Sequence, residues 1–400
     1  MKKLAIIGAG ASGLCAAIEA KKANPNIDIT IFERMQKSGK KILATGNGRC
    51  NFTNSDLSLK HFYGNDDFLK SILSSEFSDI KEFFKNLGVL SYEEEERIYP
   101  RSQQASTIKE ALLKAVESEN IAIKTDSHIS RIQKAENGFM VNNKYFDGVI
   151  LCGGGKAASV HGSDGSCYNL AKAFGHTLTP LHPALCGLII SDKDLNLLKG
   201  VRAESEAKLY SGNKLLGKES GEVQFTDKAI SGIPIMNLSH LCENRRDLKI
   251  NLDLCPEINE KDLLNHIKNG VSNSPSIEFE TILNGIVNLK LGFAVMNRSG
   301  IKPQSKCKSL KDFQIKDVVN QLKNFEINIK SAKGFENAQV TKGGIKTNEV
   351  SSVTMMSKKA TALFICGEIL DIHGDCGGYN LHLAFTTGRI AGNNAGKFLK

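Results

Sequence analysis

The spacing of apolar residues changes abruptly near the start of the chain. Residues 3–7 form a short apolar run that is typical of a buried strand, and after a glycine-rich turn Leu14, Ala17 and Ile18 recur on one helical face. Residues 27–33 then alternate isoleucine with polar neighbours and end on a carboxylate. The pattern therefore predicts a strand, a tight turn, a helix and a second strand.

Further along, helical and strand spacings follow one another. Residues 68–88 and 105–120 have helical periodicity, and the acidic run between them, "YEEEERIYPRS", is expected to be a solvated loop or a helix end. Short strand signals follow at 121–133, 138–143 and 144–155, and the last of these ends in glycines. This order of elements is typical of an α/β domain.

Residues 181–336 have a different character. Up to about residue 257, short strand-like pieces bracket Gly, Asn and Ser turns, which predicts a small antiparallel barrel or sandwich with return strands at about 325–336. Residues 258–324 instead have apolar residues at helical spacing. The helical segments are 259–269, 278–295 and 310–324.

The chain then returns to the earlier pattern, with a buried strand, a glycine-rich turn and a last helix from about Tyr379. We therefore interpret 181–336 as an insertion. Residues 1–180 and 337–400 are expected to form one discontinuous domain around it.

Composition narrows the class of protein. With 41% hydrophobic and 24% charged residues, the chain is ordinary for a globular protein, and its apolar runs are far shorter than the roughly 18 residues that suggest a membrane span. The apolar run after the two N-terminal lysines is too short for a signal peptide. A cytoplasmic location without membrane contact is expected.

The cysteines, charges and histidines argue against a disulfide framework, a nucleic-acid partner and a metal site. The ten cysteines are scattered without a C-x-x-C pair, which favours reduced thiols over a disulfide framework. The net charge of +9 comes from basic residues interspersed with acidic ones, so a nucleic-acid partner is not favoured. Histidines and cysteines do not have the spacing of a metal site, and no metal is expected.

The first glycine-rich turn has the spacing of a dinucleotide-binding fingerprint. In this context Gly8 makes the tight turn, Gly10 lets the backbone approach a pyrophosphate, and Gly13 lets helix and strand pack closely. Glu33 lies 20 residues beyond Gly13, at the end of the second predicted strand, where a carboxylate can accept hydrogen bonds from a ribose. The motif predicts a bound dinucleotide but does not choose between NAD and FAD.

The C-terminal segment favours FAD. Gly367-Glu368 follows a predicted buried strand, as if a carboxylate reaches toward a sugar-like chain, and Gly377-Gly378 opens the last helix. A helix N-terminus aimed at the pyrimidine edge of a flavin would stabilise the negative charge that develops there on reduction.

Five segments carry a resemblance to a known family: "KKILATGNGRCNFTN", "ERIYPRSQQAS", "GEVQFTDKAISGIP", "TKGGIKTNEV" and "CGEILDIHGDCGGYNLHLAFTTGRIAG". Together they resemble the YhiN/BaiN family of FAD-dependent oxidoreductases from end to end. The stretches "HGSDGSCYNLAKAFGH" and "TKGGI" also resemble, more faintly, the broader fumarate-reductase-like flavoproteins. The resemblance implies a glutathione-reductase-like, Rossmann-type FAD-binding domain interrupted by an inserted β-barrel and a helical region. It also implies reduction of a carbon–carbon double bond next to a carbonyl in a small organic substrate.

The resemblance assigns the segment after the second strand to the cofactor. Residues 40–51 are expected to line the pyrophosphate and the flavin ring. With no second fingerprint in the sequence, NAD(P)H is expected only as a transient donor. The residues expected to bind FAD are Gly8, Gly10, Ala11, Ser12, Gly13, Glu33, Arg34, Lys40, Lys41, Gly48, Arg49, Cys50, Asn51, Ile129, Gly153, Gly154, Gly367, Glu368, Gly377, Gly378, Tyr379, Asn380 and Leu381.

The catalytic residues are left open. A lone thiol at Cys50 is expected to pack against the flavin rather than react, because dithiol reductases need a second cysteine nearby. His373 and Asp371 would lie near the ring, but the family usually has an acidic residue where this chain has His373. Two other functions stay as alternatives: a flavoprotein that acts on RNA, and a flavin-binding interaction protein. The oligomeric state is not predicted.

Overall fold

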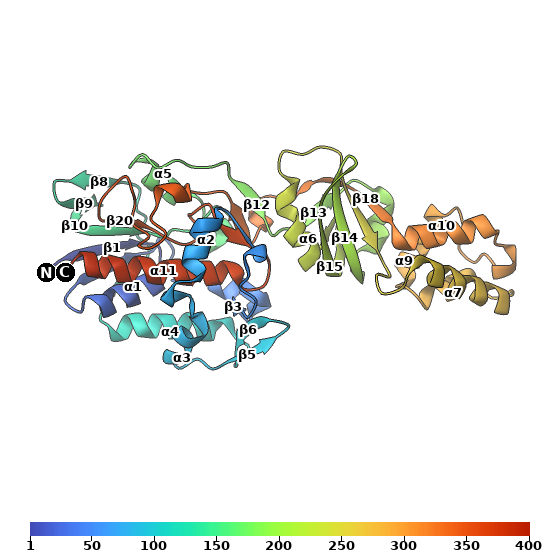
Figure 1. Cartoon of the computed structure of the whole chain (residues 1–400), viewed down its shortest axis with the longest axis horizontal. Helices are drawn as coiled ribbons and strands as arrows, with labels where there is room; N and C mark the ends of the chain where they lie inside the picture. The colour runs from blue at the N-terminus through green and yellow to red at the C-terminus, as the bar shows by residue number, and fades with distance from the viewer. The chain divides into compact units, whose positions relative to one another are not determined.

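Two segments that are distant in the sequence fold together in the structure. The computed structural model describes residues 1–400, apart from the side chain of Lys193, with Met1–His182 and Gln339–Lys400 in one unit and Pro183–Ala338 in a second (Figure 1). Each unit has its own cluster of buried apolar side chains. Each unit therefore has the separate hydrophobic core that a domain requires.

The first unit is built on a parallel sheet with the strand order β20-β11-β1-β2-β7. The central strand β1 has four of its five residues buried, as expected for a parallel strand that is covered on both faces. The strands are β1 (Lys3–Ile7), β2 (Asp28–Phe32), β7 (Ala122–Lys124), β11 (Gly148–Leu151) and β20 (Leu363–Ile365).

A three-stranded antiparallel sheet connects β7 to β11. It consists of β8 (Ile132–Ala135), β9 (Gly138–Val141) and β10 (Lys144–Phe146), in the order β10-β9-β8. Asn142 and Asn143 have φ of 44° and 61°, and they form the tight turn between β9 and β10. The parallel sheet with this antiparallel excursion confirms the predicted α/β, Rossmann-type class.

Three helices accompany the parallel sheet: α1 (Ala11–Ala23), α4 (Ala105–Ser118) and α11 (Tyr379–Phe398). Helix α1 packs against β1, β2, α4 and α11 (Figure 1), and it is buried without interruption from its second to its tenth residue. Its alanine-rich sequence fits this setting, because small side chains let neighbouring elements approach closely.

Glycines of α11 bring its backbone very near to α1. They are spaced four residues apart, so they lie on one face of the helix. A Cβ on any of them would collide with a carbonyl oxygen of α1; the pairs are Gly388 with Ser12, Gly392 with Ala16, and Gly396 with Ala20. The two helices are therefore locked in one register.

Shorter elements complete the first unit. The acidic run expected to be a loop or helix end instead forms a hairpin, because Glu95 and Glu96 take positive φ and turn β5 back on β6. The segment with helical spacing at 68–88 forms two helices, separated by residues 74–79, which include the short 3-10 helix Glu76–Ser78. The elements are β3 (Thr53–Asn54), β4 (Phe62–Tyr63), α2 (Asp66–Leu73), α3 (Ile80–Asn86), β5 (Ser91–Glu94), β6 (Arg97–Pro100), α5 (Ser166–Lys172), β19 (Val340–Lys342) and β21 (His373–Gly374), and β12 (His182–Ala184) lies where the first unit's sequence meets the second's.

The second unit contains a closed six-stranded barrel, as the turn-rich strand pattern predicts. Along β18, Phe325, Ile327 and Ile329 point inward and alternate with exposed polar residues. The barrel order is β13-β16-β15-β14-β17-β18. The strands are β13 (Leu188–Ile190), β14 (Arg202–Ser211), β15 (Lys214–Thr226), β16 (Ala229–Ser231), β17 (Leu248–Asp253) and β18 (Phe325–Ala332).

Between β17 and β18 the second unit is helical, in agreement with the spacing of its apolar residues. The segment 278–295 forms two helices rather than one, since α8 ends at Gly285 and the side chain of Asn288 caps α9. The helices of the unit are α6 (Ile233–Leu238), α7 (Glu260–Asn273), α8 (Phe279–Asn284), α9 (Leu289–Arg298) and α10 (Asp312–Lys323).

Candidate functional site

The turn between β1 and α1 contains three glycines with different roles. Gly8 has φ of +114°, and a Cβ there would lie 2.7 Å from the carbonyl oxygen of Cys152, while a Cβ at Gly13 would collide with the carbonyl oxygen of Gly8. The chain itself fills both positions. A Cβ at Gly10, by contrast, would have no atom within 4 Å. The space in front of Gly10 is therefore open to a ligand.

This open space lies at the N-terminus of α1. The N-cap residue Gly10 has no side chain to cap the helix, so the first N–H groups, among them those of Ala11 and Ser12, have no partner within it. These groups and the partial positive charge of the helix end form a site suited to phosphate.

Glu33 is fixed beside this turn at the carboxyl end of β2. Its Oε2 accepts a hydrogen bond from the N–H of Ala9 (2.9 Å), and its Oε1 accepts one from the N–H of Met35 (2.8 Å). Each carboxylate oxygen has a second lone pair, so the group can still accept hydrogen bonds from two ribose hydroxyls. The neighbouring Arg34 forms an ion pair with Asp164.

The segment after β7 approaches the same place. The N–H of Ser127 donates to the carbonyl oxygen of Glu33 (2.8 Å), and Ile129 is buried two residues later. Gly153 and Gly154 follow β11, and their missing side chains make room for Cys167 and the hydroxyl of Ser163. The structure thus brings these predicted residues to the edge of the sheet where the parallel strands end.

Glu368 follows β20 at the same edge. Its Oε2 accepts from Nζ of Lys41 (2.7 Å), and its Oε1 accepts from the N–H of Thr341 (3.0 Å). Gly367 has φ of +81°, and a Cβ there would collide with the hydroxyl of Ser12. The segment that contains Lys41 therefore spans from the end of β2 to the end of β20, and Lys40 donates to the carbonyl of Val160 (3.3 Å).

A buried hydroxyl near Glu368 has no hydrogen-bond partner among the described residues. It belongs to Tyr168 of α5, which is 2% exposed. Burial and, to a lesser extent, the charges of Glu368 and Asp371 raise the pKa of this phenol, so it is a neutral donor. An unsatisfied buried donor costs stability, which indicates that a bound molecule supplies the acceptor.

The segment 40–51 is compact. Its short helix η1 (Ile42–Gly48) is interrupted at Gly46, and a Cβ at Gly48 would meet no atom within 4 Å. Arg49 faces the β5–β6 hairpin, where it pairs with Glu94 (3.0 Å) and lies over the ring of Tyr99, 4.4 Å from its centroid. Gly48 leaves space beside this segment, while the charge of Arg49 is balanced by a protein carboxylate.

Cys50 is fully buried behind this segment. Burial raises the pKa of its thiol to about 12, so it is protonated at neutral pH and a poor nucleophile. Asn51 follows and is half-buried, with its backbone nitrogen near Gly46.

The start of α11 lies on residues 51–54. Nδ2 of Asn54 donates to the carbonyl oxygen of Gly377 (3.0 Å), and a Cβ at Gly378, whose φ is +94°, would lie 2.5 Å from the carbonyl oxygen of Thr53. Tyr379 is buried, the side chain of Asn380 closes the turn by accepting from the N–H of Gly374 (2.9 Å), and Leu381 is half-buried. The predicted C-terminal residues therefore meet the predicted segment 40–51 at its last residue, Asn51, whose carbonyl oxygen would lie 3.0 Å from a Cβ at Gly378.

The sequence did not predict a group of side chains that lies beside the contact between α11 and residues 51–54. Strand β4 pairs with β21 and places Tyr63 opposite His373, with ring centroids 5.0 Å apart, while His61 contacts Asp375. Asp371, which was expected near the flavin together with His373, donates its N–H to Ile345 (3.0 Å). No sequence signal links His61 to Asp375, because 314 residues separate them.

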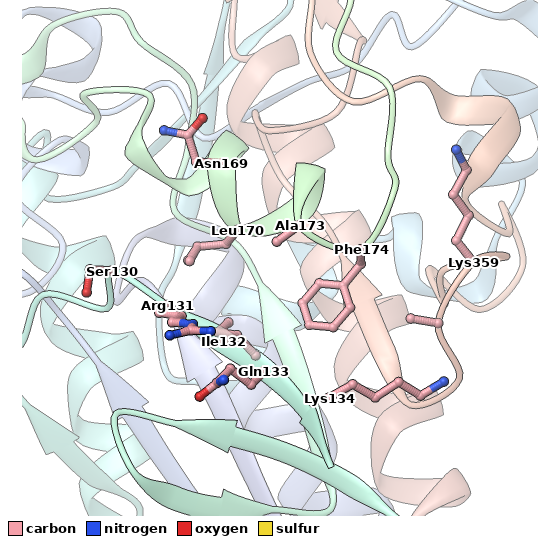
Figure 2. Close-up of a pocket in the computed structure, with 11 residues that line it drawn as sticks. Ser130, Arg131, Ile132, Gln133, Lys134, Asn169, Leu170, Ala173, Phe174 and Lys359 are labelled. Atoms are coloured by element: carbon pink, nitrogen blue, oxygen red, sulfur yellow. The ribbon is translucent and has the colours of Figure 1, made fainter. Parts of the chain in front are cut away.

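A separate pocket of about 620 Å³ lies on the same unit, between β8 and α5 (Figure 2). Figure 2 shows Arg131 and Lys134 on its β8 side and the ring of Phe174 across from them. The amine of Lys359 at its rim pairs with Glu349 (2.7 Å). None of the residues expected to bind FAD lines this pocket, so it is distinct from the candidate site.

Two negative findings hold for the described part of the chain. No group of three or more His, Cys, Asp or Glu side chains there is arranged to hold a metal ion. None of its helices combines the length and the apolar character that crossing a membrane requires.

Known proteins resemble this chain over nearly its whole length. A profile described as HI0933-like protein Rossmann domain matches residues 2–394. The chain is similar to the 3-dehydro-bile acid delta(4,6)-reductase of Clostridium scindens, with 35% identity over 405 residues that cover 99% of each protein. It is also similar to the ribosomal RNA dihydrouridine synthase of Haemophilus influenzae, with 27% identity over 394 residues, or 96% of this chain and 95% of that protein.

Among solved structures, the 3-ketosteroid delta1-dehydrogenase of Sterolibacterium denitrificans aligns with a TM-score of 0.52 and 11% identity. The alignment covers 99% of this chain and 100% of that one. At this level of identity the likeness concerns the fold alone.

Proposed function

We propose a function for this chain from one premise: it belongs to the HI0933-like family of Rossmann-domain proteins. This membership confirms the family resemblance predicted from the sequence. On that premise we infer that the chain is an FAD-dependent oxidoreductase. Its reaction is the transfer of hydride or electrons that reduces a carbon–carbon double bond next to a carbonyl in a small organic substrate.

The observation that carries the proposal is the open turn at Gly10 with Glu33 fixed beside it. The residues fit the adenosine diphosphate part of FAD, because the N-terminus of α1 offers unpaired N–H groups to the phosphates and Glu33 keeps free lone pairs for the ribose. The unpartnered hydroxyl of Tyr168 would donate to the ribityl chain or a phosphate.

The remaining predicted residues would hold the rest of the cofactor. Lys41 and Glu368 fix each other at the edge of the sheet, and residues 40–51 would cover the cofactor from one side. The N-terminus of α11 would face the pyrimidine edge of the flavin, where its partial positive charge favours the reduced anion. When bound, FAD supplies the two-electron chemistry, and the protein supplies position and electrostatics.

The substrate class rests on the bile acid reductase relative. Its printed name describes a reductase of a 3-dehydro compound with 4,6 unsaturation, and the two chains align over nearly their whole lengths. We therefore propose an enone or dienone as the substrate, with NAD(P)H as a donor that binds transiently. A cytoplasmic location is consistent with these donors.

The proposal is tested by purifying the protein and measuring its visible spectrum. Stoichiometric FAD is expected, followed by anaerobic bleaching with NADH or NADPH and recovery of the oxidised spectrum on addition of a 3-dehydro-4,6-dienoic bile acid. A protein that takes up no flavin, or whose flavin no donor reduces, would contradict the proposal.

A second candidate function is reduction of uridine in ribosomal RNA, favoured by the similarity to the Haemophilus influenzae synthase. The 5,6 double bond of uracil is also next to a carbonyl, so both candidates need the same chemistry. The same reduced protein, mixed with unmodified ribosomal RNA, separates them: dihydrouridine formation would favour the RNA, and recovery of the oxidised spectrum only with the bile acid would favour the small molecule.

A further inference from the structure

The pairing of β4 with β21 gathers four ionisable side chains into a hydrogen-bonded series. The ring of His61 lies between two carboxylates, with Nδ1 3.0 Å from Oδ2 of Asp375 and Nε2 3.2 Å from Oδ2 of Asp56. The hydroxyl of Tyr63 donates to the other oxygen of Asp375 (2.8 Å). The order of the series is therefore Asp56, His61, Asp375, Tyr63.

The series runs from solvent into the protein as far as Asp375, and Tyr63 at its other end is half-buried. The side chain of Lys60, which pairs with Asp56 at 2.8 Å, is 67% exposed, and that of Asp56 is 27% exposed. The exposed fraction then falls to 22% for His61 and 7% for Asp375. A proton that enters at Asp56 can thus reach Asp375 through direct contacts, without crossing an apolar layer.

The inner end of the series lies where the flavin is expected. Asp375 comes two residues before Gly377-Gly378, and the first residue of α11, Tyr379, stacks its ring on His61 with centroids 4.7 Å apart. The ring of Tyr63 in turn stacks on His373, which is 4% exposed. Two chain segments that are distant in the sequence, 56–63 and 373–379, converge on this series, so its geometry is fixed by the fold.

The surroundings of the two carboxylates favour a proton on Asp375 rather than on Asp56. Burial raises the pKa of Asp375 even though His61 and Tyr63 act in the opposite direction, while hydrogen bonds from Lys60 and Ser58 lower the pKa of Asp56. The ionisable groups around His61 are Asp56, Lys60, Tyr63, Asp375 and Tyr379, with Glu96 and Arg97 of the hairpin near Tyr379.

We propose that Tyr63, Asp375 and His61 form a proton relay, in which Tyr63 gives the proton that completes the reduction and the other two replace it from solvent. This inference rests on the proposed function. In the reduction of an enone, hydride adds to the β-carbon, the electron pair of the double bond moves toward the carbonyl, and the α-carbon then takes a proton.

Each transfer has a partner in the structure. The O–H bond of Tyr63 breaks as the α-carbon gains its C–H bond, and Asp375, which accepts the hydrogen bond of Tyr63 at rest, then acts as the donor and gives its carboxyl proton to the phenolate. Asp375 takes one from Nδ1 of His61, which is recharged from water through Asp56. Two electrons arrive with the hydride and one proton comes from water, so charge and atoms balance.

The experiment separates the two half-reactions by stopped flow. Tyr63→Phe is expected to slow recovery of the oxidised flavin by a 3-dehydro-4,6-dienoic bile acid by about a hundredfold or more, and to leave flavin reduction by NAD(P)H within twofold. Asp375→Asn and His61→Gln are expected to slow recovery about tenfold and to change its pH profile. The matched control is Tyr145→Phe, whose hydroxyl bonds the carbonyl of Asn137 (2.8 Å) in the antiparallel sheet, and it should change neither step.

A second measurement needs no substrate. The imidazole N–H that His61 shares with Asp375 should give a downfield proton NMR signal, which moves upfield in Asp375→Asn and disappears in His61→Gln. The relay would be overturned if the unmodified protein lacked that signal. It would also be overturned if Tyr63→Phe recovered its oxidised flavin as fast as the unmodified protein. Failure of the flavin to bind or to be reduced would instead overturn the proposed function, so the two failures are distinguishable.

Discussion

Helices α1 and α11 both begin after a glycine N-cap that offers no side chain, yet the two glycines differ in what surrounds them. At Gly10 a Cβ would meet no atom within 4 Å, whereas at Gly378 it would lie 2.5 Å from the carbonyl oxygen of Thr53. On the side toward which a Cβ would point, the first turn is open and the second is closed by the chain. A glycine at a helix start therefore leaves room for a ligand in one place, and permits close packing of the protein in the other.

The largest effect is expected at the open turn. Gly10→Val should lower FAD affinity by about a thousandfold, or about 4 kcal/mol, because the branched side chain occupies the space in front of the helix. Its φ of −86° suits valine, so the stability of the FAD-free protein should change by less than about 0.5 kcal/mol. Flavin retention on gel filtration and urea unfolding measure the two effects. A fully loaded yellow variant would contradict the assignment of this turn to the pyrophosphate.

The closed turn should behave in the opposite way. Gly378→Ala is expected to cost about 3 kcal/mol of unfolding free energy, since it adds the strain of a positive φ to a collision with Thr53. The matched control is Gly88→Ala, where φ is +82° but no atom lies within 4 Å, and it should cost only about 1 kcal/mol. Equal losses in the two variants would mean that the turn at Gly378 is not closed.

A histidine beneath the closed turn gives a pH test. Nδ1 of His382 lies 2.9 Å from the hydroxyl of Thr53 and Nε2 lies 3.1 Å from that of Ser78, and burial lowers the pKa of His382 to about 4. The unfolded chain therefore binds a proton at this histidine more readily than the folded chain does. The contribution of His382 to the free energy of unfolding is fully present above about pH 6.5, and it should fall by about 2 kcal/mol by about pH 5. Urea unfolding across this range should show a shallower slope in His382→Gln, and an unchanged slope in the exposed control His128→Gln.

The smallest effect is expected at Cys50. Cys50→Ser should keep FAD and turnover, and cost about 1 kcal/mol or less of stability, because the buried thiol is protonated and only packs. Complete loss of turnover with FAD still bound would show that the thiol takes part in the reaction.

The open turn could be predicted from the sequence because its parts are local. Strand β1, the three glycines and α1 are adjacent, and Glu33 follows at the end of the next strand. Each element is specified by its own apolar spacing or by a steric need for glycine. The barrel and the helical segment of the second unit were predictable for the same reason.

The closed turn and the relay could not be predicted in this way. The fit of Gly378 depends on residues 51–54 passing beneath it, and the pairing of Arg49 with Glu94 depends on a hairpin that looked like a solvated acidic run. His61 meets Asp375 only after β4 and β21 have paired. Such contacts arise from tertiary structure, and neither periodicity nor residue spacing encodes them.

The glycine face of α11 has a consequence for synthesis on the ribosome. Helix α1 is among the first elements to emerge, but its partner α11 is translated only after the entire second unit. Until then the surface of α1 around Ala16 has no cover, whereas the second unit is continuous in sequence and can fold as soon as it emerges. We expect nascent chains to hold a folded barrel beside an incomplete first unit, and to depend on chaperones until α11 has docked.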